Sequence, residues 1–168
     1  MHPLAKLLND ADGFLLIGDS ANDRFPGYSY NAYSQVGKRF FCLDLGGLTA
    51  SRGPTKGGKV YTRVDELPAD RDDLAIVWVK PRDAKRAVDV AHEAGCKRIW
   101  FSFQTGHRDA VAHARELGME VVEIGRCPVY YLEGAPAACA AHTLLARASG
   151  TRPRAPQLDP DAKRRELW

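Results

Sequence analysis

Residues 74–124 have the sequence LAIVWVKPRDAKRAVDVAHEAGCKRIWFSFQTGHRDAVAHARELGMEVVEI, which contains two β–α units in succession. Three short apolar runs in this stretch are rich in β-branched and aromatic residues, as expected of strands buried on both faces of a sheet. These runs are 74–79, 98–103 and 120–124. The two segments between them carry apolar residues at i, i+3, i+4 and i+7, which predicts helices over 83–94 and 107–117. Because strand and helix alternate, the stretch predicts a parallel sheet with right-handed crossovers.

The same alternation extends toward both ends of the chain. Apolar runs at 14–17 and 39–43 predict two further strands, and residues 28–36 predict the helix between them. Residues 1–10 and 135–148 are expected to form flanking helices. The predicted fold is therefore α/β, a doubly wound, five-stranded parallel sheet with helices on both faces.

One domain is expected over residues 1–149, because 168 residues suit a single hydrophobic core. Residues 150–168 contain Pro153, Pro156 and Pro160, so we expect a mobile C-terminal tail there.

Composition and charge argue against several classes of protein. Hydrophobic residues make up 45% and the formal net charge is only +3, which does not indicate a nucleic-acid partner. Apolar runs are too short to span a membrane, and the first residues lack the layout of a secretory signal. The four cysteines show no CxxC spacing, and no His/Cys cluster has zinc-ligand spacing. We therefore expect a cytoplasmic domain without a bound metal and with reduced thiols.

Candidate ligand-binding residues follow the predicted strands. In an open parallel sheet, ligands bind beyond the carboxyl ends of the strands, where the winding direction reverses. After the first strand, Gly18 allows a close turn, Ser20 and Asn22 offer short polar side chains, and Arg24 offers a fork for phosphate. The next helix begins near Tyr28 and presents free backbone N–H groups.

Similar loops follow the later strands, and each pairs a turn-forming residue with a polar side chain. Their candidate ligand-binding residues are Lys80, Pro81, Arg82, Gln104, Thr105, Gly106, Arg126 and Cys127. The alternative interpretation is that these are ordinary polar loops.

Four short motifs occur in order on these loops: Ile17-Gly18-x-Ser20, Pro81-Arg82, Trp100 with Gln104 and Gly106, and Arg126-Cys127-Pro128. Together they resemble the stand-alone CoA-binding domain family, which is similar to the CoA-binding Rossmann domain of the succinyl-CoA synthetase α subunit. The resemblance covers residues 10–135. It implies a Rossmann-like domain that binds coenzyme A, an acyl-CoA or a similar adenine nucleotide, with no catalysis of its own.

Asp44 departs from the family, whose members usually end the second strand with Asn-Pro. An acid at this place is what a dinucleotide site uses to bind the ribose of NAD. The carboxylate would also repel the 3′-phosphate of CoA, unless Arg52, Lys56 and Lys59 in the next loop offset it. An NAD-linked small oxidoreductase that uses Asp44 is thus one alternative, and a solvated, non-binding carboxylate is another.

A further alternative is a nucleotide-binding subunit of a synthetase-like complex. Assembly of the chain with copies of itself also stays open.

Catalysis is not expected. Cys127 lies beside Arg126, which favours a thiolate, but His107 is the one histidine expected at the same edge. A structural thiol before the turn-forming Pro128 is the preferred interpretation. We therefore predict no catalytic residues and interpret the chain as a binding module rather than an enzyme.

Overall fold

The structure is a computed structural model that describes residues 1–25, 27–48, 59–150 and 155–161. Its centre is a six-stranded sheet with the order β3-β2-β1-β4-β5-β6, in which every pairing is parallel. The strands are β1 (Phe14–Gly18), β2 (Phe40–Asp44), β3 (Val60–Tyr61), β4 (Leu74–Trp78), β5 (Arg98–Phe101) and β6 (Glu120–Ile124).

The prediction of five strands was wrong by one. The additional strand, β3, has two residues and pairs through Val60 with Cys42 and through Tyr61 with Leu43 of β2. So short a segment shows no alternation in the sequence, and its strand geometry depends on the backbone of β2 beside it.

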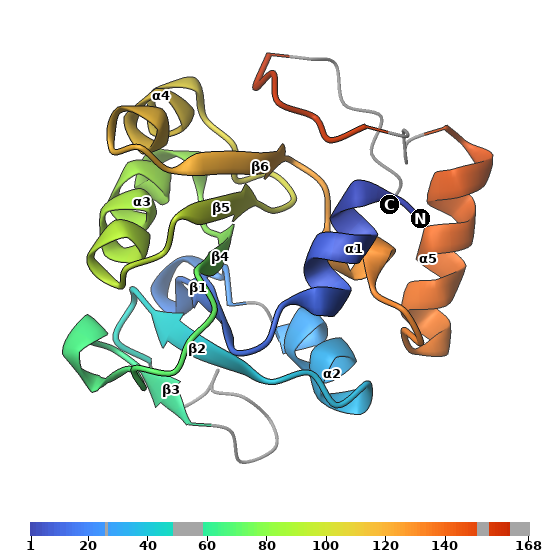
Figure 1. Cartoon of the computed structure of the whole chain (residues 1–168), viewed down its shortest axis with the longest axis horizontal. Helices are drawn as coiled ribbons and strands as arrows, with labels where there is room; N and C mark the ends of the chain where they lie inside the picture. The colour runs from blue at the N-terminus through green and yellow to red at the C-terminus, as the bar shows by residue number, and fades with distance from the viewer. Residues whose placement is uncertain (26, 49–58, 151–154, 162–168) are drawn as a thin grey trace.

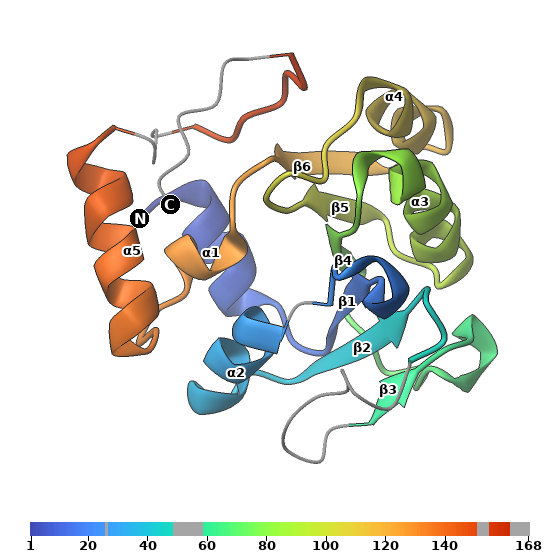
Figure 2. The same cartoon turned by 180° about the vertical axis from the view of Figure 1, so that it is seen from behind.

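Helices cover both faces of the sheet (Figures 1 and 2). On one face lie α3 (Ala84–Glu93) and α4 (Arg108–Glu116). On the other lie α1 (Pro3–Asp10) and α2 (Gly27–Gln35), and α5 (Ala137–Ala148) stands outside them. The described residues also form four short 3-10 helices, η1 (Ser20–Asn22), η2 (Val64–Glu66), η3 (Pro81–Asp83) and η4 (Pro128–Tyr131).

Strand residues pack alternately against these two layers. In β1, Leu15 and Ile17 belong to the core under α3 and α4, whereas Phe14 and Leu16 pack against Tyr33 and its neighbours on the other face. All five residues of β1 are buried. A continuous apolar run is therefore needed here, since a polar residue on either face would lose its water.

The winding of the chain reverses between β1 and β4, which lie side by side at the centre of the sheet. The carboxyl ends of all strands point to one edge, which we call the carboxyl edge. The loops that follow β1, β2, β4 and β5 therefore meet at the switch point, where open α/β sheets bind their ligands.

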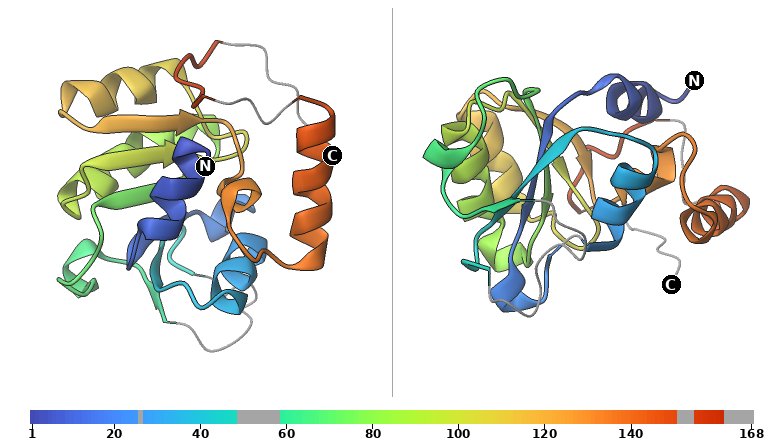
Figure 3. Two further views of the ribbon diagram at one scale, coloured as in Figure 1. Left: turned by 45° about the vertical axis from the view of Figure 1, so that its right-hand side comes forward. Right: turned by 90° about the horizontal axis from the view of Figure 1, so that it is seen from below.

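Part of the C-terminal tail, for which mobility was expected, lies against β6 (Figure 3). Ile124 donates its backbone N–H to the carbonyl of Gln157 at 2.9 Å, and the Gln157 N–H donates to Glu123 Oε2 at 2.6 Å. Arg108 forms an ion pair with Asp161. The two Gln157 bonds occupy the end of the edge strand β6, where polar backbone groups would otherwise be open to pairing with another strand.

No helix in the described ranges is long and apolar enough to cross a membrane.

Candidate functional site

The loop after β1 is held closed by its own residues. Asp19 and Arg24 exchange two backbone hydrogen bonds of 2.8 Å each. The Asp19 carboxylate, which is buried, also accepts from the Asn22 backbone N–H at 3.2 Å and from Asn22 Nδ2 at 2.7 Å. Asp19 thus caps η1 and fixes the direction of the Asn22 side chain.

Asp44 joins the loops that follow β1 and β2. Its Oδ1 accepts from the backbone N–H groups of Ser20 at 2.7 Å and Gly46 at 3.2 Å. Its Oδ2 accepts from Ser20 Oγ at 2.6 Å and from the Leu48 N–H. Asp44 is 1% exposed, and a carboxylate has about four lone-pair sites. All of its acceptor capacity is therefore used inside the protein.

Gly46 lets these two loops approach each other. A Cβ placed at Gly46 would lie 2.5 Å from the backbone nitrogen of Ala21, which is closer than atoms can pack. The Asp44 hydrogen bonds and the missing Cβ thus act together to seat the β1 loop on the β2 loop.

Three cations gather at the switch point. Asn22 Oδ1 accepts from Arg82 Nη2 at 2.7 Å and from Lys80 Nζ at 3.4 Å. Arg24 Nη2 donates to Gln104 Oε1 at 3.3 Å. We call Arg24, Lys80 and Arg82 the cation cluster.

The cation cluster is only partly neutralised. Arg82 Nε lies 3.4 Å from Asp83, but no carboxylate within the described ranges pairs with Arg24 or Lys80. The structure therefore brings together the predicted residues Asn22, Arg24, Lys80, Arg82 and Gln104, which come from three separate loops.

Trp78 lies beside the cation cluster, although it was not among the predicted ligand-binding residues. It is the last residue of β4, and the Arg24 guanidinium lies 5.6 Å from its ring centre. Its buried Nε1–H has no hydrogen-bond partner among the residues that the structure describes. A buried donor without an acceptor is costly, so this atom is suited to meet an acceptor on a ligand. The sequence signal was its place at the carboxyl end of a strand.

Backbone conformation marks the same edge. Among the described non-glycine residues, positive φ angles occur at Asp23 (59°), Leu48 (43°) and Gln104 (53°). These residues follow β1, β2 and β5, at the carboxyl edge in each case. Such conformations are held in place by their surroundings and cluster at functional sites.

Other predicted residues support these loops from within. Gly18 pairs with Asp44 in the neighbouring β2 and with Trp78 in β4, so it lies at the centre of the carboxyl edge. Thr105 is fully buried; its Oγ1 accepts from the Val79 N–H at 3.2 Å and donates to the Phe103 carbonyl at 3.3 Å.

The loops after β4 and β5 are thus fastened together by Thr105. The residue that caps the start of α4 is His107, whose side chain accepts from the Asp109 N–H. Gly106 continues the loop between Thr105 and His107, and Pro81 begins η3.

Arg126 and Cys127 lie apart from the cation cluster. Arg126 forms a 2.8 Å ion pair with Glu123, which is fully buried, and donates to Gln157 Oε1 of the tail at 3.2 Å. The Arg126 carbonyl accepts from Trp100 Nε1 at 2.8 Å. Burial raises the pKa of the Cys127 thiol to about 11, so the group is protonated at neutral pH.

Tyr28 lies in the first turn of α2, in agreement with the predicted helix start. In the loop after β2, Arg52 and Lys56 fall outside the described residues. Lys59 Nζ lies 4.5 Å from the centre of the Tyr61 ring, a cation–π contact at β3.

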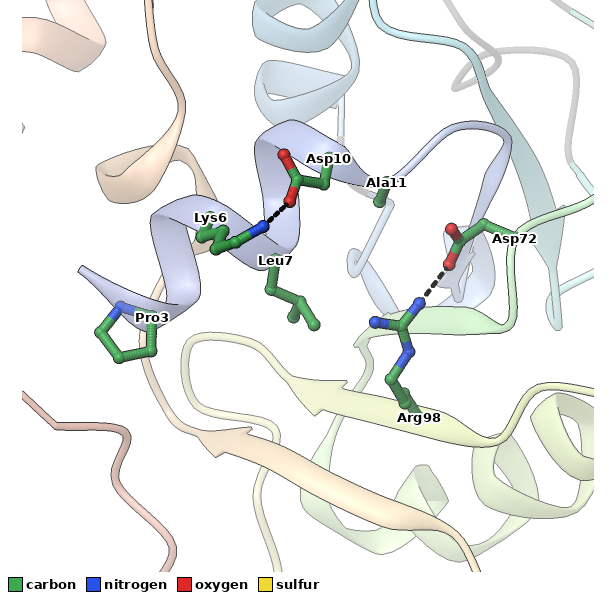
Figure 4. A pocket seen from close by; sticks show the side chains of 7 residues that line it. All are labelled: Pro3, Lys6, Leu7, Asp10, Ala11, Asp72 and Arg98. Atoms are coloured by element: carbon green, nitrogen blue, oxygen red, sulfur yellow. Dashed lines mark hydrogen bonds and ion pairs between the residues drawn. The ribbon is translucent and has the colours of Figure 1, made fainter. Parts of the chain in front are cut away.

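The opposite edge of the sheet holds a cavity of about 350 Å³ between α1 and the starts of β4 and β5 (Figure 4). Its charged side chains pair with each other, Lys6 with Asp10 and Arg98 with Asp72 at 2.9 Å. Within the ranges that the structure describes, no cluster of three or more His, Cys, Asp or Glu side chains is arranged to hold a metal. The charges that line this cavity are therefore paired, in contrast to Arg24 and Lys80 at the carboxyl edge.

Comparison with known structures supports the fold. A hypothetical protein from Pyrococcus horikoshii OT3 is 22% identical, with a TM-score of 0.62 over 76% of this chain and 86% of that one. Prb, the PH1109 protein redesigned for binding, is also 22% identical, with a TM-score of 0.61 over the same shares of the two chains. A conserved hypothetical protein from Pyrococcus furiosus is 24% identical, with a TM-score of 0.55 over 69% and 95% of the two chains.

No curated protein matches the chain. A family model described as "CoA binding domain" matches residues 13–132, which include every strand and the whole cation cluster. The chain therefore belongs to this CoA-binding domain family.

Proposed function

We propose that the protein binds coenzyme A or an acyl-CoA at the carboxyl edge and does not catalyse a reaction by itself. The observation that carries this proposal is the cation cluster, in which Lys80 and Arg82 bind Asn22 while Arg24 contacts Gln104 at the switch point of the sheet. CoA is a polyanion with a diphosphate and a 3′-phosphate. Arginine forks and a lysine suit such groups, because charge-assisted hydrogen bonds are stronger than neutral ones.

Neutral groups beside the cluster would orient the rest of the ligand. The Nε1–H of Trp78 is a buried donor, and the Gln104 amide contacts Arg24 from the neighbouring loop. We propose that both contact the ligand when Arg24 turns toward a phosphate. The start of α2 would add backbone N–H donors on the same side.

The geometry of Asp44 favours CoA over the NAD alternative. A ribose diol needs free acceptor sites on the carboxylate, and Asp44 already accepts four hydrogen bonds from the protein. Binding NAD through Asp44 would require breaking bonds that hold the two loops together.

The environments of Cys127 and His107 support a binding role rather than catalysis. Cys127 has a raised pKa, and His107 Nδ1 accepts from the Asp109 N–H at 3.3 Å, at the start of α4. Neither is arranged as a nucleophile with its base, which would need a direct hydrogen bond between the two. A role as a subunit of a synthetase-like complex stays a prediction.

Calorimetric titration of the full chain with CoA, acetyl-CoA and NAD tests the proposal. We expect CoA and acetyl-CoA to bind more tightly than NAD. At 100 times its dissociation constant, CoA should also raise the free energy of unfolding by about 2.7 kcal/mol. Tighter binding of NAD, or heat of binding from none of the three, would overturn the proposal.

A further inference from the structure

A cavity of about 440 Å³ lies on the α3 side of the sheet, between α3, η2 and the carboxyl ends of β2 and β3. Figures 1 and 2 show the segment between β3 and β4, which contains η2, next to α3. Leu43 and Leu45 line the cavity and pack in the core under α3 and α4, whereas Asp44 between them binds Ser20 in the β1 loop. The cavity therefore adjoins the carboxyl edge without the Asp44 carboxylate in its wall.

The wall that α3 contributes to this cavity continues from the cation cluster. Arg82 of the cluster and Arg86 of the cavity are four residues apart in the consecutive helical segments η3 and α3. Residues at this spacing are neighbours on one face of a helix. Arg86 also holds the β2 loop, because its Nη2 donates to the Leu45 carbonyl at 3.2 Å. The cavity thus begins about one helical turn from the cation cluster.

Two arginines line the cavity, and they differ in how their charge is used. Arg63 is paired with Asp65, with 2.9 Å between Arg63 Nε and Asp65 Oδ1. Arg86 is exposed and has no ion pair with any residue that the structure describes. A guanidinium with unused N–H donors suits a phosphate, which can accept two parallel hydrogen bonds from it. Arg86 is therefore the cation of this cavity that is available to an anionic ligand.

We propose that the cavity holds the 3′-phosphorylated adenosine end of CoA, with Arg86 bound to the 3′-phosphate; this inference rests on the proposed binding of CoA. The 3′-phosphate and the 5′-diphosphate of CoA are attached to the same ribose. A diphosphate at Arg82 and a 3′-phosphate at Arg86 agree with the one-turn spacing of the two arginines. Arg86 then selects adenosine nucleotides that carry a 3′-phosphate over those that lack it.

The rest of the cavity suits the adenine ring. Val64 of η2 and Val90 of α3 are partly buried and present apolar surface to the cavity, against which a flat ring can pack. Glu93 ends the α3 wall, about two helical turns beyond Arg86. The exocyclic amino group of adenine is a hydrogen-bond donor and suits this carboxylate. The phosphate and the base are thus assigned to opposite ends of the α3 wall.

Calorimetric titration of the full chain with CoA and with dephospho-CoA, which differ only in the 3′-phosphate, tests this assignment. The wild type should bind CoA at least about tenfold more tightly than dephospho-CoA. In Arg86→Ala the two affinities should become nearly equal, because the affinity for CoA falls and that for dephospho-CoA is unchanged. Lys85→Ala is the matched control: it removes the neighbouring exposed cation, which does not line the cavity, and should keep the preference of the wild type.

The affinity of Arg86→Ala for dephospho-CoA also verifies that the variant is folded and its site intact. Equal binding of the two nucleotides by the wild type, or a preference for CoA that Arg86→Ala leaves intact, would overturn this assignment while CoA binding itself stands. An equal loss of affinity for both nucleotides in Arg86→Ala would likewise contradict a contact with the 3′-phosphate. Binding of neither nucleotide by the wild type would overturn the proposed function, and this assignment with it.

Discussion

At the scale of single residues, Asp44 and Trp78 have surroundings that differ from those that their residue types suggested. An acid at the end of the second strand is typical of an NAD site, and a tryptophan in a strand is typical of core. Here the carboxylate accepts four hydrogen bonds from two loops, and the indole lies under Arg24 with its donor unpaired. Both differences arise from the folding together of loops that are distant in sequence.

Asp44→Asn should lower the free energy of unfolding by roughly 2–5 kcal/mol, because an amide nitrogen cannot accept two of the four donors. Urea denaturation of the variant and the wild type measures this difference in the free energy of unfolding. Asp23→Asn is the control, since Asp23 is exposed and asparagine tolerates its φ of 59°. Unchanged stability in Asp44→Asn, together with a specific loss of NAD binding, would contradict the structural role of Asp44.

Trp78→Phe should weaken CoA binding by roughly fivefold to tenfold, because the ring stays under Arg24 while the N–H donor is lost. The comparison is Trp100→Phe, which removes a donor to the Arg126 carbonyl and should lower stability without changing affinity. Equal CoA affinity in Trp78→Phe and the wild type would exclude a ligand contact by the indole N–H.

At the scale of elements, β6 and the tail form one unit. The edge strand offers a fully buried Glu123, and Arg126 and the backbone of Gln157 both bind its carboxylate. Arg126 was predicted as a ligand contact. Its ion pair indicates that its first role is to hold the tail on the sheet.

Arg126→Ala should lower the free energy of unfolding by about 3–5 kcal/mol, because it leaves a buried carboxylate without its cation. The CoA affinity of the folded variant should stay near that of the wild type. Arg115→Ala serves as control, because Arg115 also contacts the tail, through the Leu158 carbonyl, but is exposed. If Arg126→Ala instead abolished CoA binding at unchanged stability, Arg126 would belong to the ligand site.

Most elements could be predicted from the sequence because their apolar residues follow the period of a strand or helix. The ends of α3 and α4 follow from the stripe that leads to Gly95 and Gly118, each with a positive φ. The strand β3 could not be predicted, because two residues carry no period.

At the candidate site, the periodicity of the sequence predicted where the loops lie but not which of their side chains contact each other. That Asn22 would gather Lys80 and Arg82 depends on the direction in which Asp19 holds it, which no local pattern encodes. The order of the motifs located the carboxyl edge, and the three-dimensional approach of the loops decided which residues meet there.

At the scale of the whole molecule, buried thiols lie on both sides of the sheet. Burial raises the pKa of Cys42 to about 12 and those of Cys96 and Cys127 to about 11, from an ordinary value of 9.0. Cys96 belongs to the core under α3 and α4, and the other two belong to the opposite layer. Proton release by these thiols is therefore linked to unfolding of both layers.

Stability should fall as pH rises from about 9 to about 11, because the unfolded chain then loses protons that the folded chain retains. Below pH 9 the contribution is present in full. Denaturation by urea at a series of pH values measures the slope, and Cys42→Ala should show a shallower fall than the wild type. Parallel curves for the two proteins would contradict this assignment.

The central claim is that the cation cluster at the carboxyl edge binds CoA. The most direct test is calorimetric titration of CoA into the wild type, Arg24→Ala and Lys6→Ala, where Lys6 is a cation at the opposite edge of the sheet. Loss of a charge-assisted contact costs on the order of 1.5–3 kcal/mol. We predict that Arg24→Ala weakens binding by about tenfold to a hundredfold and that Lys6→Ala binds like the wild type. Equal affinity in all three proteins, or no binding of CoA to the wild type, would contradict the claim.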